Sequence, residues 1–136
     1  MLVLEDNPTD VFVIKEVLAI CAPHLQIRVA VDGREALQYL QDLDQDESAT
    51  CPALVLVDLN VPKVDGIEVL RRLRRGSRCK RTPVVVISSS TADKDRAAAR
   101  RLGAEAYFQK PKDLMAYMEL ANVIKGVLQT PGEPGR

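Results

Sequence analysis

The stretch LVLVDLNVPKVDG, residues 54–66, decides the fold of this chain. It opens with four apolar residues in a row, which is typical of a strand buried on both faces in the middle of a parallel sheet. Asp58 follows this run and would lie at the strand's carboxyl end, the edge where open α/β sheets hold ligands and reactive groups. Asp58 is therefore either a reactive carboxylate or the start of a turn, which aspartate also favours. The stretch alone leaves both readings open.

Apolar runs and helical periodicities alternate along the whole 136-residue chain. Strands are expected at 1–4, 25–31, 53–58, 84–87 and 104–108, and helices are expected to start at Asn7, Asp32, Asp65, Thr91 and Asp113. Five such βα units predict an α/β fold, a doubly wound five-stranded parallel sheet with helices on both faces. In the last helix, Leu114, Tyr117 or Met118, Ala121, Ile124 and Leu128 are expected to point inward. Residues 1–129 are predicted to form one domain, followed by a disordered Pro/Gly-rich tail at 130–136.

The charges balance, with 19 basic and 19 acidic side chains. We therefore expect no general attraction to nucleic acid or to a membrane surface. The basic run at 71–81 and the acidic run at 42–47 are interpreted as solvated surface. No apolar run approaches the ~18 residues of a membrane span, and no signal-peptide pattern is present.

Three cysteines, Cys21, Cys51 and Cys79, are widely spaced and form no CxxC motif. This spacing argues against a disulfide framework or a zinc site and favours a protein of the reducing cytoplasm. His24, the only histidine, follows a proline in an expected loop and is not a predicted ligand or base. Because the chain enters its first strand directly at Met1, we expect native residues to precede it.

Polar groups follow the predicted strands at one edge of the sheet, namely Glu5 and Asp6, Asp58, Ser88 and Lys110. Three carboxylates at close range repel one another unless a cation neutralises them. Oxygen ligands without histidine or cysteine select a hard cation, Mg²⁺ or alternatively Mn²⁺. With a lysine and a hydroxyl nearby, the site suits a phosphoryl group carried on a carboxylate.

The motifs Glu5-Asp6, Asp58-Leu-Asn60-Val-Pro62-Lys-Val-Asp65-Gly66, Ser88 and Lys110-Pro111 occur in this order and spacing. In them the chain resembles the receiver domain of two-component response regulators over about residues 1–129. The resemblance implies a flavodoxin-like sheet of order 2-1-3-4-5. It also implies that the chain accepts a phosphoryl group from a histidine kinase, then switches a partner or relays the group, and turns over no external substrate.

The resemblance implies a role for each matching residue. Asp58 would accept the phosphoryl group, and Ser88 and Lys110 would bind its oxygens. Asp6, Asp58 and the Asn60 backbone carbonyl would bind Mg²⁺, with Glu5 reaching it through water. Tyr107 would be the switch aromatic that turns inward as Ser88 moves. The Lys110–Pro111 peptide is expected to be cis.

A narrower resemblance links the chain to stand-alone receivers that partner phytochrome-type histidine kinases. It rests on residues 5–10 (EDNPTD), the loop at 42–52 and residues 110–114 (KPKDL). Homodimerisation through the fourth helix, fifth strand and fifth helix is a hypothesis motivated by the apolar residues Leu114, Met115, Tyr117 and Met118.

Three other functions share part of this pattern. A haloacid-dehalogenase-type phosphohydrolase also uses an aspartate nucleophile. Enzymes of that type resemble one another in a second aspartate two positions later, the general acid, and this chain has Asn60 there. A flavodoxin-like flavin carrier would find Glu5 and Asp6 repelling the flavin phosphate. A pseudo-receiver that only binds partners fits poorly with the intact set Asp6, Asp58, Ser88 and Lys110. The phosphorylation switch remains the favoured prediction.

Overall fold

A computed structural model describes residues 1–129, so the predicted disordered tail lies outside the described residues. The strands are β1 (Leu2–Leu4), β2 (Arg28–Ala30), β3 (Val55–Asp58), β4 (Val84–Ser88) and β5 (Ala106–Gln109). The helices are α1 (Pro8–Cys21), α2 (Gly33–Gln45), α3 (Gly66–Arg75), α4 (Asp93–Arg101), the 3₁₀-helix η1 (Leu114–Met118) and α5 (Glu119–Gln129).

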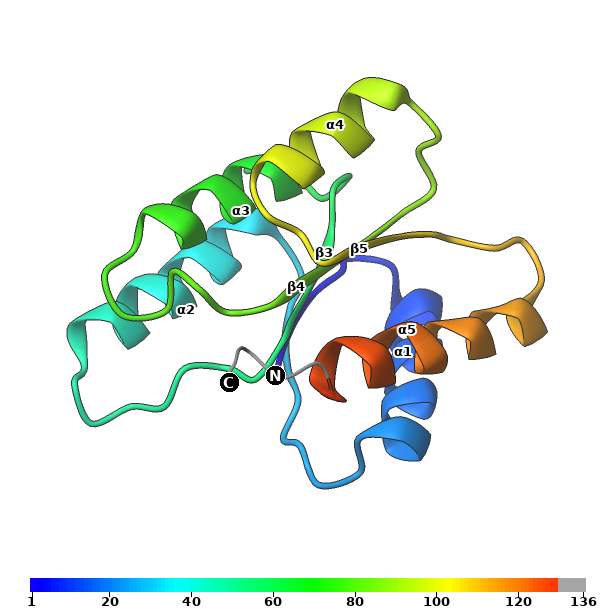
Figure 1. Cartoon of the computed structure of the whole chain (residues 1–136), viewed down its shortest axis with the longest axis horizontal. Helices are drawn as coiled ribbons and strands as arrows, with labels where there is room; N and C mark the ends of the chain where they lie inside the picture. Colours follow the sequence, from blue (N-terminus) through cyan, green and yellow to red (C-terminus); the bar gives the residue numbers. More distant parts are fainter. Residues whose placement is uncertain (130–136) are drawn as a thin grey trace.

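The strands form one parallel sheet in the order β2-β1-β3-β4-β5, which confirms the predicted topology. Helices α1 and α5 cover one face, and α2, α3 and α4 cover the other (Figure 1). Because successive strand residues point to opposite faces, Leu56 and Val85 pack with α1 and α5, whereas Val57 and Val86 pack with the other layer. The apolar run at 54–57 is fully buried between the two layers.

Three helices have the N-terminal side-chain caps that the sequence predicts. Asn7 Oδ1 accepts hydrogen bonds from the backbone of α1, and Asp32 and Asp65 do the same for α2 and α3. Each satisfies backbone N–H groups that the first helical turn leaves unpaired. The prediction that Thr91 caps α4 is wrong, because Ala92 stands at the N-cap. Ser90 Oγ instead accepts from Ala92 N at 3.1 Å and donates to Asp95 at 2.6 Å.

The last helix starts as a 3₁₀-helix. Asp113 accepts a hydrogen bond from Met115 N at 2.9 Å, so the predicted start is confirmed. Within η1, Tyr117 is 1% exposed, but Leu114 is 58% exposed. The prediction that Leu114 points inward is therefore wrong. A single short turn of 3₁₀-helix places one large side chain in the core, whereas a longer α-helix would bury a stripe.

A disulfide joins Cys51 to Cys79, whose Cα atoms lie 5.6 Å apart. The prediction that the cysteines form no disulfide is therefore wrong. Since β3 and β4 are parallel neighbours, the connections that lead into them lie side by side, although 28 residues separate the two cysteines. Asp44 and Arg78 tie the same connections together: Asp44 Oδ1 accepts from Arg78 N at 2.8 Å, and the Arg78 guanidinium donates to the Ala49 carbonyl.

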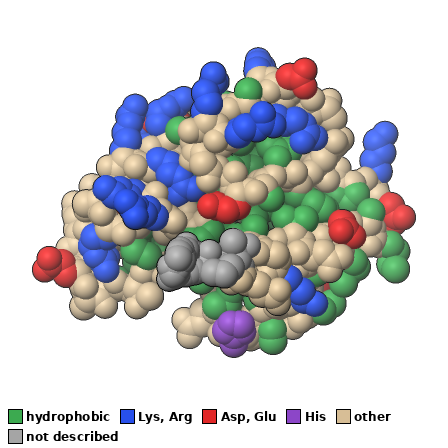
Figure 2. Space-filling model, viewed as in Figure 1, with side chains coloured by type: hydrophobic (Ala, Val, Ile, Leu, Met, Phe, Trp, Pro, Cys, Tyr) green, Lys and Arg blue, Asp and Glu red, His purple; other side chains and the backbone are tan. Residues whose placement is uncertain are grey.

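The basic run at 71–81 is only partly solvated surface. Figure 2 shows Lys and Arg side chains gathered over α3 and α4. Arg74, however, donates to the backbone carbonyls of Leu102 at 2.7 Å and Thr82 at 2.6 Å, and thereby fixes the connections around β4 and β5. Arg74 and Arg78 therefore hold loops together rather than face a partner.

Candidate functional site

The polar residues predicted from the strand ends meet at the carboxyl edge of the sheet. Glu5 and Asp6 follow β1, Asp58 and Ser88 end β3 and β4, and Lys110 follows β5. Backbone bonds extend the sheet pairing into this edge: Glu5 N donates to Ala30 O at 3.0 Å, and Lys110 N donates to Ser88 O at 2.8 Å. The side chains therefore start from backbone positions that the sheet itself fixes.

Three carboxylates cluster there. Glu5, Asp6 and Asp58 each place an oxygen within 4.8 Å of the others. Glu5 and Asp58 are buried, whereas Asp6 is open to solvent at the rim. Burial raises the pKa of Glu5 to about 7; the hydrogen bond from Lys110 opposes this shift, and the charge of Asp58 adds to it. The buried carboxyl of Glu5 therefore holds a proton more tightly than an ordinary glutamate does.

Lys110 is the cation of the site. Its Nζ lies 2.8 Å from Glu5 Oε1, 2.9 Å from Asp10 Oδ2 and 2.8 Å from Asp58 Oδ2. Burial opposes the charge, but the close contacts with the three carboxylates outweigh it and hold the pKa of Lys110 above its usual value. Lys110 is therefore a permanent positive charge. The predicted cis peptide before Pro111 is wrong, since residues 1–129 contain no cis peptide bond.

Asp10 belongs to this site, and the sequence reasoning missed it. The residue stands in the first turn of α1, and its two oxygens have different partners. Oδ2 accepts from Lys110, and Oδ1 accepts from the Tyr117 hydroxyl at 2.9 Å. Burial, together with the bond to Asp10, raises the pKa of Tyr117, which therefore stays a donor. The position of Asp10 one turn beyond Asp6 was the signal available in the sequence.

Asn60 bridges the two strand ends β3 and β4. Its backbone N donates to Asp58 Oδ1 at 3.0 Å, and its side-chain amide donates to Ser88 Oγ at 3.4 Å. Ser88 Oγ also accepts from Ser90 N at 3.1 Å. Asn60 thus links Ser88 to Asp58, through its side chain on one side and its backbone N on the other. Its backbone carbonyl as a metal ligand stays a prediction.

Tyr107 connects β5 to the loop after β4. It is half-buried, and its hydroxyl donates to Ser90 O at 3.1 Å. The guanidinium of Arg96 in α4 lies 4.5 Å from the centre of its ring, within cation–π range. Tyr107 is therefore attached to the segment that follows Ser88, and its role as a switch stays a prediction.

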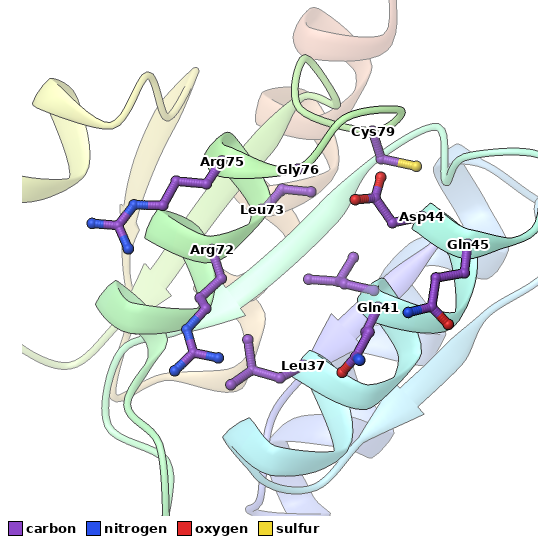
Figure 3. A pocket seen from close by; sticks show the side chains of 10 residues that line it. Leu37, Gln41, Asp44, Gln45, Arg72, Leu73, Arg75, Gly76 and Cys79 are labelled. Atoms are coloured by element: carbon purple, nitrogen blue, oxygen red, sulfur yellow. The ribbon is translucent and has the colours of Figure 1, made fainter.

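A groove of about 300 Å³ lies elsewhere, between α2 and α3. Figure 3 shows Leu37 and Gln41 of α2 opposite Arg72 and Leu73 of α3, with Cys79 at one end. No residue of the carboxylate cluster lines this groove. The chemistry suggested by the strand ends therefore belongs to the carboxyl edge of the sheet.

The comparison with protein families matches residues 1–122 to the response regulator receiver domain, so this chain belongs to the response regulator receiver family, whose members are signalling proteins. The response regulator Rcp1 of Synechocystis is 32% identical over 127 residues, which cover 93% of this chain and 84% of Rcp1. Within residues 1–129, no helix combines the length and the apolar character needed to cross a membrane.

Solved structures of phytochrome-related response regulators share the fold of this chain. The phosphorylated cyanobacterial phytochrome response regulator RcpA superposes with a TM-score of 0.84 at 34% identity, covering 95% of this chain and 93% of RcpA. The Mn²⁺-bound form of Rcp1 gives 0.82 at 32% identity, with 95% and 94% covered. The bacteriophytochrome response regulator AtBRR gives 0.71 at 35% identity, with 93% and 91% covered. The predicted similarity to phytochrome-related receivers is confirmed.

Proposed function

We propose that residues 1–129 act as a magnesium-dependent phosphorylation switch, with Asp58 as the acceptor. The observation that carries this proposal is the contact of Lys110 Nζ with Asp58 Oδ2 at 2.8 Å, inside a cluster that also holds Glu5 and Asp6. A carboxylate next to a fixed cation and beside further carboxylates suits the transfer of a phosphoryl group, because catalysis of that step is mainly positioning and charge neutralisation.

The donor set of the site fits a hard divalent cation. Carboxylate oxygens from three residues converge within 4.8 Å, and the cluster contains neither histidine nor cysteine. Asp6, Asp58 and the Asn60 carbonyl would hold Mg²⁺, with Glu5 reaching it through water. The cation would neutralise charge on the phosphoryl oxygens. Mn²⁺ is an alternative, supported by the Mn²⁺-bound form of the relative Rcp1.

In the proposed reaction, a carboxylate oxygen of Asp58 attacks the phosphorus of a kinase phosphohistidine. The new O–P bond forms as the P–N bond breaks, and the electron pair leaves with the imidazole, which takes up a proton. Lys110 would bind one phosphoryl oxygen and Ser88 another. Asn60 N, which donates to Asp58 Oδ1, orients the attacking carboxylate.

The test is incubation with acetyl phosphate and Mg²⁺, followed by intact mass and by lability to hydroxylamine. The wild-type chain should gain one phosphoryl group, and Asp58→Asn should gain none. Asp46→Asn, which changes an exposed aspartate at the end of α2, is the matched control and should label normally. Equal labelling of the Asp58→Asn chain would overturn the proposal.

The phosphoryl donor in the cell is proposed to be a phytochrome-type histidine kinase. RcpA and AtBRR, described as phytochrome and bacteriophytochrome response regulators, support this choice. We place the exchange in the cytoplasm, and we propose that the chain turns over no external substrate. Transfer of a phosphoryl group from a purified bacteriophytochrome kinase to wild type, but not to Asp58→Asn, is the expected result.

The proposed output is a change at the α4–β5–α5 face. Ser88 would move toward the phosphoryl group, and Tyr107 would turn inward and leave Arg96. Leu114, Met115 and Met118 are exposed on η1 and are proposed to support a homodimer, whereas Tyr117 is buried and cannot contribute. Sedimentation with and without beryllofluoride tests this part: a monomer in both conditions would exclude the dimer.

A further inference from the structure

Asp10 joins the reactive edge of the sheet to the apolar segment η1. One oxygen of its carboxylate accepts from Lys110 at 2.9 Å, and the other accepts from the Tyr117 hydroxyl at 2.9 Å. These partners stand 100 and 107 residues further along the chain. Lys110 in turn contacts Asp58 at 2.8 Å. An unbroken line of charged and polar contacts therefore runs from Asp58 to η1.

Tyr117 is the anchor of η1. Its side chain is 1% exposed and lies beside Phe108 of β5, with ring centres 6.1 Å apart. A five-residue 3₁₀-helix has few backbone hydrogen bonds of its own, so its position depends on this buried side chain. A buried hydroxyl also needs its acceptor, because an unpaired one is costly. If the Asp10 carboxylate moves, the Tyr117 side chain should therefore move with it to keep this hydrogen bond.

The residues around the anchor face solvent. Leu114 is 58% exposed, Met115 is 77% exposed and Met118 is 40% exposed. Exposed apolar side chains grouped in this way are typical of a protein–protein contact surface. A shift of η1 would therefore change the surface that a partner binds. The contact network thus ends at an apolar surface, not at a purely structural turn.

We infer that Asp10 is a positioning residue, which holds Lys110 toward Asp58 and passes the state of Asp58 on to η1 through Tyr117. This inference rests on the proposed function. A phosphoryl group on Asp58 adds acceptor oxygens that draw Lys110 away from Asp10. Asp10 then loses one of its two donors, its carboxylate reorients, and Tyr117 shifts with it.

The chain provides its own reporters for a test. Its methionines are Met1, Met115 and Met118, so methyl-labelled methionine gives NMR signals from η1 with little overlap. The wild-type chain is compared before and after addition of beryllofluoride with Mg²⁺. Two variants break the link at different points: Asp10→Asn removes the charge facing Lys110, and Tyr117→Phe removes only the hydroxyl. Tyr39→Phe in α2 is the matched control.

The expected result is a shift of the Met115 and Met118 signals in wild type and in Tyr39→Phe, and loss of that shift in both variants. Labelling of Asp58 by acetyl phosphate, measured by intact mass, should be unchanged in Tyr117→Phe and Tyr39→Phe. It should be slower but still detectable in Asp10→Asn, because Asp10 positions Lys110 beside Asp58. The double variant should lose no more than either single variant, because both changes act on one link. Thermal unfolding of each variant confirms that it is folded.

Two different failures are distinguishable. If both variants label at Asp58 and keep the wild-type methyl shifts, the inference about Asp10 is wrong while the proposed function stands. If the wild-type chain takes up no phosphoryl group and shows no shift, the proposed function fails, and the inference falls with it.

Discussion

The Lys110 ammonium lies 2.8 Å from the Asp58 carboxylate, although 52 residues separate the two in sequence. Their strands are not neighbours in the sheet, since β4 lies between β3 and β5. The lysine therefore reaches across the end of β4, where Ser88 stands, to meet the carboxylates beyond it. This contact makes the charge balance of the whole edge depend on one side chain.

Replacement of Lys110 by methionine should destabilise the metal-free protein. It would leave Glu5, Asp10 and Asp58 without their shared cation, and breaking a buried ion pair typically costs about 3–5 kcal/mol. Urea unfolding in the presence of a chelator measures the loss. Added Mg²⁺ should recover more stability in the variant than in wild type, because a divalent cation would take over the neutralisation.

Lys112→Met is the control for this substitution, because Lys112 is exposed two residues further on. Its unfolding curve should match that of wild type. An unchanged curve for Lys110→Met would show that the ion pairs contribute nothing measurable.

Stability of the metal-free protein should fall as the pH rises toward 8, through Glu5. Its pKa is about 7 in the folded protein against 4.5 ordinarily, so the folded state binds the proton more tightly than the unfolded state. The resulting stabilisation is full below about pH 4.5 and is lost as the pH rises through about 7. Its size is about 3 kcal/mol. Glu5→Gln should remove this component of the pH dependence.

Urea unfolding between pH 5 and pH 8 with a chelator measures both chains. Glu16→Gln, which changes an exposed glutamate of α1, should keep the wild-type slope. A Glu5→Gln chain that also keeps the wild-type slope would contradict the assignment of the raised pKa to Glu5.

Reduction of the Cys51–Cys79 disulfide should lower stability by about 3–4 kcal/mol, the loop-closure estimate for a loop of this size. Thermal unfolding with and without dithiothreitol measures the change. Cys21 is the free cysteine, so Cys21→Ser should respond to the reductant as wild type does, whereas the Cys51→Ser/Cys79→Ser chain should not respond. Alkylation of all three thiols in the unreduced, denatured protein would show that the bridge does not form.

In a reducing cytoplasm, cellular thiols would be expected to reduce this disulfide.

Substitution of Gly66 by alanine should disturb the acceptor directly. The added Cβ would lie 2.4 Å from the Asp58 carbonyl oxygen and 2.7 Å from the Leu59 Cα, and both are backbone atoms with little freedom to move. We expect a loss of about 1–3 kcal/mol, as for other overpacked sites, and slower labelling of Asp58. Gly126→Ala is the matched control: its Cβ would meet nothing within 4 Å, so it should stabilise α5 by about 0.5–1 kcal/mol. Equal behaviour of the two variants would exclude a special role for the close packing at Gly66.

Local sequence patterns were sufficient to predict the central strand and the starts of several helices. The apolar run at 54–57 predicted a buried central strand, and the caps Asn7, Asp32 and Asp65 marked where helices begin, because each signal depends on residues within one or two turns. The end of each strand then placed Glu5, Asp58 and Lys110 on one edge. The predicted bounds of the edge strands were less accurate. A strand was predicted at 25–31, but β2 covers only Arg28–Ala30, because it pairs on one side only and extends no further than its short partner β1.

By itself, the sequence determined the doubly wound sheet and the set of residues at its carboxyl edge, because periodicity and capping are local. Only the tertiary structure decided which of them touch. It gave Lys110 three carboxylate partners, brought Asp10 and Tyr117 to the site, and joined Cys51 to Cys79. Those contacts span 28 to 107 residues and depend on strand order and side-chain direction, which no local pattern encodes.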